Sequence, residues 1–87
     1  MQRRSEEQQN LLLTVAGEGV PMDKVIAVVN ETCAAADLKR LDDTTKTGEA
    51  TFIVELTDVD ELMKCKSALQ ELDESVRVTF LDNRGVI

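Results

Sequence analysis

Apolar positions follow two different periodicities in the first third of the chain. Leu11 to Ala16 reads LLLTVA and is apolar at both alternating sets of positions, which is typical of a strand in the middle of a sheet. The glycine-rich GEGVP then interrupts the run, and Pro21 suits the first position of a helix. Apolar residues recur at helical spacing after it: Met22, Val25, Ile26, Val29 and Cys33. The pattern predicts a strand followed by a helix.

A hairpin is predicted next. The segment from Asp37 to Thr45 is polar and charged, which is the composition of an exposed edge strand. Gly48, in KTGE, is the predicted turn residue. The second arm, Ala50 to Leu56, alternates between apolar and mixed positions with period two, as a strand does.

The last third of the chain changes from strand to helix and back. Thr57 or Asp58 caps the predicted helix, and Glu61 stands three residues after Asp58 as in a capping box. The apolar stripe of this helix is Leu62, Cys65, Leu69 and Leu72. DES ends the helix, and VRVTFL (76–81) is the last predicted strand, with Val76, Val78 and Phe80 on one face. A turn at DNRG precedes the final VI, which is either a short extension or the chain end.

The order strand, helix, strand, strand, helix, strand is the split βαβ, or ferredoxin-like, plan. The predicted fold class is α+β: a βαββαβ sandwich with a four-stranded antiparallel sheet and two helices on one face. This plan places the first and third strands in the middle, where the chain has LLL and FIV, its segments most apolar on both faces. We expect residues 1–10 to be a polar leader or linker and residues 11–87 to form one domain.

Two helices on one side leave the other face of the sheet open. We place six residues on that face: Leu12, Thr14, Thr51, Ile53, Glu55 and Leu81. Leu12 and Ile53 would be neighbours on the two central strands, and a central apolar cluster of this kind is typical of a contact surface. The predicted interface residues are Leu12, Thr14, Thr51, Ile53 and Leu81. We expect a homodimer or contact with another part of a longer protein, with a monomer as the alternative.

Residues 11–82 resemble ACT-like regulatory domains in the order of their elements and in the segment AGEGVPMDKV. In that family the turn after the first strand and the start of the first helix commonly bind a small effector at a subunit interface. The resemblance implies effector contacts at Gly17, Gly19 and Asp23. The family usually has an acidic residue near the turn and then Pro-Gly, whereas Pro21 here is followed by Met22. Turn geometry is the alternative role for both glycines.

The run GEATFIVELTDVDELMKCKSALQELDESVRVTFLDNRGVI resembles the cytosolic C-terminal domains of uncharacterised bacterial membrane proteins akin to the MgtC group. A polar linker precedes such domains, as MQRRSEEQQN precedes LLLTV here. The resemblance implies a cytoplasmic domain, tethered to the inner membrane within the full-length protein. It brings no catalytic motif.

Composition removes several classes of function. The net charge of −7 over 87 residues argues against nucleic-acid binding, and no run of 18 apolar residues would insert into a membrane. The chain has no His, the commonest general base near neutral pH, so we expect no enzymatic activity and no cofactor. Cys33 and Cys65, which form no CxxC motif, are expected to be buried thiols; a disulfide or a shared soft-metal site are the alternatives.

The sequence therefore predicts a non-catalytic regulatory or assembly domain, acting by oligomerisation or by sensing a small effector. The alternative is a carboxylate-based divalent metal-binding domain or a stand-alone small-molecule-binding protein. Its candidate ligands are Asp42 with Asp43, and Asp58 with Asp60 and Glu61. Neither spacing matches a calcium loop, and helix capping accounts for Asp58 and Glu61 without a metal.

Overall fold

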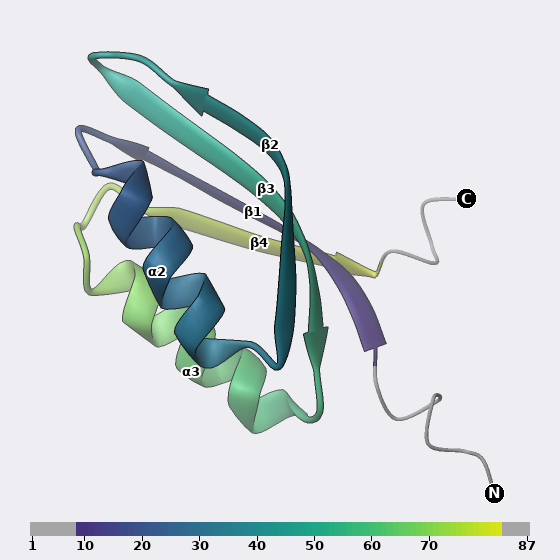
Figure 1. The fold of residues 1–87 in the computed structure, drawn as a ribbon. Coiled ribbons are helices and arrows are strands. Elements are labelled where there is room, and N and C mark those ends of the chain that lie inside the picture. The colour runs from purple at the N-terminus through teal and green to yellow at the C-terminus, as the bar shows by residue number, and fades with distance from the viewer. Residues whose placement is uncertain (1–8, 83–87) are drawn as a thin grey trace, which may run out of the picture.

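Six elements fold into one sheet and one helical layer (Figure 1). The structure is a computed structural model that describes residues 9–82. The elements are β1 (Gln9–Glu18), α2 (Met22–Thr32), β2 (Ala35–Asp43), β3 (Thr47–Leu56), α3 (Val59–Gln70) and β4 (Arg77–Asp82). The strands form an antiparallel sheet in the order β2-β3-β1-β4, and both helices lie on one of its faces. The predicted ferredoxin-like βαββαβ fold is confirmed, with β1 and β3 in the middle.

The core lies between the helices and the alternate residues of the central strands. Each strand points every second side chain at the helices, because successive residues face opposite ways. The fully buried side chains on that face of the sheet include Leu13, Val15, Phe52 and Val54. They pack against the predicted helical stripes, of which Val25, Val29, Cys65 and Leu69 are buried completely or almost so. Removal of this apolar surface from water is the main force that holds the layers together.

The two helices begin in different ways. Pro21 is the residue before the first helical residue of α2, not the first position as predicted, and its carbonyl accepts a hydrogen bond from the Lys24 N–H at 3.1 Å. Asp58 caps α3, as predicted, since its Oδ1 accepts from the Glu61 N–H at 2.9 Å. Glu61 Oε1 accepts in return from the Thr57 N–H at 3.1 Å, one residue before the cap. The predicted capping box is thus present in a slightly displaced form.

The hairpin turn was predicted in the wrong place. β2 ends at Asp43 and β3 begins at Thr47, so Gly48 lies inside a strand and not in the turn. The turn is held by Thr44, whose backbone N–H and hydroxyl both donate to the Thr47 carbonyl, at 2.8 and 2.9 Å. The turn is therefore stabilised by hydrogen bonds of a threonine hydroxyl to nearby backbone groups, and not by the glycine that the sequence predicted.

The remaining element boundaries differ by a few residues from those predicted from the sequence. β1 begins at Gln9, so its first two residues belong to the segment that we expected to be a leader. Leu72 lies beyond the end of α3 but still packs against the core. The rest of the leader, and the turn and extension expected after residue 82, lie outside the described residues. Neither helix within residues 9–82 is long and apolar enough to cross a membrane.

Candidate functional site on the open sheet face

Rows of side chains cross the open face of the sheet, and their character changes along the strands. Strand register aligns Ile53 and Leu81 with Leu12 on either side of β1, which makes an apolar row, with Asp37 of β2 next to Ile53. The next row consists of Thr51, Thr14 and Thr79, the threonine row, with Arg40 next to Thr51. The charged row beyond it consists of Asp42, Glu49, Ala16 and Arg77, and on the other side of the apolar row lie Asn10, Glu55 and Ala35. The apolar row is therefore a patch on the central strands and β4, bordered by polar and charged residues.

The apolar row is the part of this face that sequence reasoning located. Leu81 is 51% exposed, while Leu12 and Ile53 are half-buried by their neighbours in the sheet. Both helices lie on the opposite side, so no element within residues 9–82 packs over the row. All five residues of the predicted interface lie on this face; their role in an interface stays a prediction.

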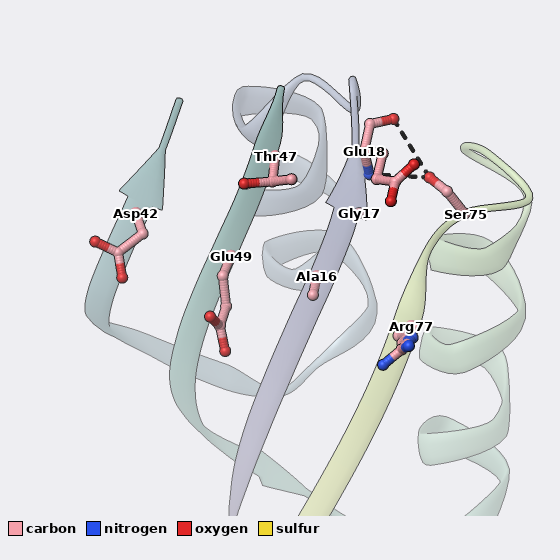
Figure 2. A pocket seen from close by; sticks show the side chains of 9 residues that line it. Ala16, Gly17, Glu18, Asp42, Thr47, Glu49, Ser75 and Arg77 are labelled. Atoms are coloured by element: carbon pink, nitrogen blue, oxygen red, sulfur yellow. Dashed lines mark hydrogen bonds between the residues drawn. The ribbon is translucent and has the colours of Figure 1, made fainter. Parts of the chain in front are cut away.

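A shallow hollow of about 250 Å³ lies at the charged end of the face (Figure 2). Its lining comes from all four strands and the loop before β4: Ala16, Gly17, Glu18, Asp42, Thr47, Gly48, Glu49, Ser75 and Arg77. The view in Figure 2 has the helices behind the sheet, with the side chains of Glu49 and Asp42 on neighbouring strands and Arg77 across β1 from them. The hollow is open to solvent.

The hollow combines an excess of negative charge with one guanidinium group. Asp42 and Glu49 are directly opposite each other on β2 and β3, and like charges in that position destabilise a sheet. Arg40 relieves part of this repulsion, because its Nε donates to Asp42 Oδ2 at 2.9 Å. Glu49 has no ion-pair partner among the described side chains. The carboxylate side of the hollow therefore favours a cationic group, and Arg77 favours an anionic one.

Ser75 fastens one wall of the hollow. The Glu18 N–H donates to Ser75 Oγ at 3.0 Å, and the Ser75 hydroxyl donates to the Glu18 carbonyl at 3.3 Å (Figure 2). These bonds tie the loop before β4 to the end of β1. The backbone N–H of Ser75 also donates to Asp73 Oδ2 at 2.9 Å, and hydrogen bonding by Ser75 lowers the pKa of the exposed Asp73. The wall is thus a hydrogen-bonded loop and not a free end.

Two of the residues that line the hollow are glycines, and packing on the helix side of the sheet leaves no room for a Cβ at either. Gly17 and Gly48 are cross-strand partners. A Cβ on Gly17 would lie 2.7 Å from Val20 Cγ2, and a Cβ on Gly48 would lie 2.8 Å from Met22 Cε. Hydrogens on these two residues let the start of α2 pack tightly under the sheet at this end.

The three predicted effector residues are not brought together. Gly17 lines the hollow, whereas Gly19 lies in the following turn with φ at +72° and its N–H donating to the Lys46 carbonyl at 3.1 Å. Asp23 is exposed in the first turn of α2 and does not line the hollow. Gly19 has the turn role proposed as the alternative, and an effector contact at any of the three stays a prediction.

Sequence reasoning missed the charged row. Arg77 had been assigned to a strand but to no site, and Glu49 had been assigned to a turn. With the turn placed at Gly48, Glu49 was assigned to the turn and not to β3, so it was not set beside Ala16 or opposite Asp42. The sequence did contain a signal for a turn before Gly48: Thr44, because threonine hydroxyls often form hydrogen bonds with the backbone of a turn.

The carboxylates considered for a metal site are kept apart. Asp42 pairs with Glu49 on the open face, while Asp43 pairs with Gly48 and points to the helix side, because strand residues alternate. Asp58 and Glu61 are occupied in capping α3. Within residues 9–82 no three Cys, Asp or Glu side chains gather in a way that would hold a metal ion.

Comparison with known proteins bears on the fold. The sequence matches no protein-family model and none of the curated proteins. The ACT domain from GTP pyrophosphokinase of Chlorobium tepidum is similar in structure, with a TM-score of 0.66 at 13% identity, over 85% of this chain and 99% of that one. The fold is ACT-like. The uncharacterized protein TM1266 from Thermotoga maritima is similar with a TM-score of 0.56 at 18% identity, over 88% of this chain and 99% of that one.

The similarities cover 99% of each of the two solved chains. What those chains have in common with this protein is the fold. At such low identity they show a fold and no activity. Neither similarity bears on the predicted relation to bacterial membrane proteins.

Proposed function

We propose that this chain is a non-catalytic regulatory or assembly domain that acts through the open face of its sheet. The observation that carries the proposal is the apolar row. Leu12, Ile53 and Leu81 lie in register on three adjacent strands, with no described element packed over them. Contiguous apolar residues on a bare face are typical of an interaction surface.

A second copy of the chain is the partner that we infer for this face. Each chain carries a net charge of −7; Asp42 and Glu49 lie in the charged row, while Asp37 and Glu55 lie beside the apolar row. A two-fold axis through the apolar row would place apolar rows against each other and send the two charged rows to opposite ends. That arrangement buries the apolar side chains and keeps the two charged rows apart. The resemblance to domains of bacterial membrane proteins suggests another partner, the rest of a longer parent protein, which would dock on the same apolar row.

A charge in the apolar row tests this proposal. We expect the wild-type chain to be a dimer by light scattering coupled to size exclusion, and Ile53→Glu to be a folded monomer, since a buried unpaired carboxylate opposes association. Val59→Glu is the matched control, because Val59 is 70% exposed on α3, on the other side of the molecule. If Ile53→Glu leaves the mass of a wild-type dimer unchanged, the association uses another surface.

A second function is favoured by the charged hollow: sensing of a small effector. Carboxylates on β2 and β3 face one guanidinium on β4, so the hollow suits a molecule with a cationic group and an anionic group close together. Here the resemblance to ACT-like domains and the chemistry of the hollow point to the same class of role, a sensor without catalysis.

Thermal shifts with a panel of free amino acids at millimolar concentration test the effector proposal. We expect at least one to raise the melting temperature of the wild-type chain and to lose this effect in both Glu49→Gln and Arg77→Gln. Asp23→Asn is the matched control, because Asp23 does not line the hollow. Loss of the effect in Asp23→Asn, with Glu49→Gln unaffected, would move the site to the start of α2.

A further inference from the structure

The only two cysteines of the chain lie next to each other between the two helices. Cys33 follows the last residue of α2 as its C-cap, and Cys65 lies within α3. Their sulfur atoms are 3.9 Å apart, although the residues are 32 positions apart in the sequence. Both thiols are free and buried, as the sequence predicted.

The two thiols differ in their access to solvent. Cys33 is 8% exposed, because the chain leaves the helix there, whereas Cys65 is 0% exposed. Cys33 is therefore the less enclosed of the two, and we expect a small reagent to react there first, with Cys65 beside it as the resolving cysteine.

We propose that Cys33 and Cys65 form a reversible disulfide that links the end of α2 to the middle of α3. A disulfide needs its sulfurs about 2.05 Å apart, so the gap of 3.9 Å must close by a little under 2 Å. Rotation of two unbranched side chains provides movement on this scale without a new backbone path. The product would bind the two halves of the helical layer covalently.

The reaction is an exchange with a small-molecule disulfide, R–S–S–R. The Cys33 thiolate attacks one sulfur of R–S–S–R, which forms a mixed disulfide and expels R–S⁻. Cys65 then attacks the Cys33 sulfur from its neighbouring position and expels the second R–S⁻. The two protons lost by the cysteines convert these leaving groups to two R–SH, so the protein loses two electrons and the reagent gains them.

The hydrogen bond between the two thiols belongs to the reduced pair. It lowers the pKa of Cys65 to about 7, against the effect of burial. The same hydrogen bond, with burial, raises the pKa of Cys33 well above its usual value, so the first step is expected to be slow. Once Cys33 is in the mixed disulfide it has no S–H to donate, and the second step relies on the proximity of the two sulfur atoms.

Oxidised glutathione is the probe for this inference. On the wild-type chain we expect a mass loss of about two hydrogens, no free thiol under denaturing conditions, a monomeric band on a non-reducing gel and full reversal by dithiothreitol. The closed loop restricts the unfolded chain, so the melting temperature should rise on oxidation.

Single variants separate the two roles. Cys65→Ala should stop with one glutathione attached at Cys33, and Cys33→Ala should stay unmodified, because Cys65 is buried. Circular dichroism tests whether each variant is folded. If a variant does not fold, the thiol count of the wild-type chain still tests the proposal. Two free thiols after prolonged exposure, a stable mixed disulfide in the wild-type chain, or disulfide-linked dimers would each overturn the proposal. None of these results depends on the sheet face.

Discussion

At the scale of single residues, steric fit explains more of this domain than chemistry does. Gly17 and Gly48 occupy positions where any Cβ would meet the residues that lead into α2. Gly19 differs, because nothing lies within 4 Å of its ideal Cβ and only its φ of +72° favours glycine. The sequence assigned Gly17 and Gly19 to a turn, but Gly17 lies within β1, and its contact with Val20 depends on packing that no local pattern contains.

Gly17→Ala is predicted to lower the free energy of unfolding by about 1–3 kcal/mol, as overpacking does. Val20 is β-branched and cannot move its methyl group away, whereas Met22 can flex, so Gly48→Ala should cost less. Urea unfolding of Gly17→Ala in the wild-type and Val20→Ala backgrounds measures the coupling. A cost that is the same in both backgrounds would contradict the steric account.

Gly19→Ala is the matched comparison. It should cost about 1–2 kcal/mol through its backbone conformation alone, and this cost should not change in the Val20→Ala background, since the methyl group enters open space.

At the scale of elements, the periodicities predicted every helix and strand, and the errors lie at their boundaries; the largest is the hairpin turn, where side-chain hydrogen bonds hold the chain. The cap of α3 was readable because Asp58 and Glu61 have a known spacing. The turn at Thr44 was not, since Gly48 gave a stronger local signal. That one displacement left Glu49 out of β3, and with it the charged row of the candidate site, although the neighbouring positions of Leu12 and Ile53 were predicted correctly.

Asp58→Ala is predicted to lower the free energy of unfolding by about 1 kcal/mol, because the Glu61 N–H loses its acceptor. Asp58→Asn keeps an oxygen acceptor and should retain most of the stability. Chemical unfolding of both variants decides the point. Equal losses would mean that the negative charge near the helix start matters and the hydrogen bond does not.

The pH dependence of stability should report on the contact between α2 and α3. With the native pKa of Cys65 lowered to about 7 from 9.0, the unfolded chain holds more thiol protons than the folded one between pH 7 and 9. The free energy of unfolding should therefore rise across this range. Above pH 9 it should fall, because the pKa of Cys33 is raised and the folded chain keeps a proton that the unfolded chain releases.

This maximum near pH 9 is measurable because the chain has neither His nor Tyr to titrate in the same range. The slope on either side should not exceed about 1.4 kcal/mol per pH unit. Unfolding under reducing conditions from pH 7 to 10 gives the curve, with Cys33→Ala/Cys65→Ala as the control. A curve that matches the control would show that the thiols contribute nothing.

At the scale of the whole molecule, the arrangement of side chains along the open face is the feature on which the proposed function rests. Helices cover one face of the sheet, and no element within residues 9–82 covers the other. Here that face carries an apolar row, a threonine row and a charged row in order along the strands. The sequence predicted which residues lie on the face, but this order of rows emerges only when four strands are in register.

Methyl NMR on the wild-type chain at increasing dilution tests the role of this face most directly, since it needs no substitution. We predict that the methyl resonances of Leu12, Ile53 and Leu81 shift together as a dimer dissociates. Leu38 and Leu41 are the internal controls: they are exposed on β2 at 40% and 45% and point to the helix side. Shifts confined to Leu38 and Leu41, or no concentration dependence at all, would contradict self-association through the open face.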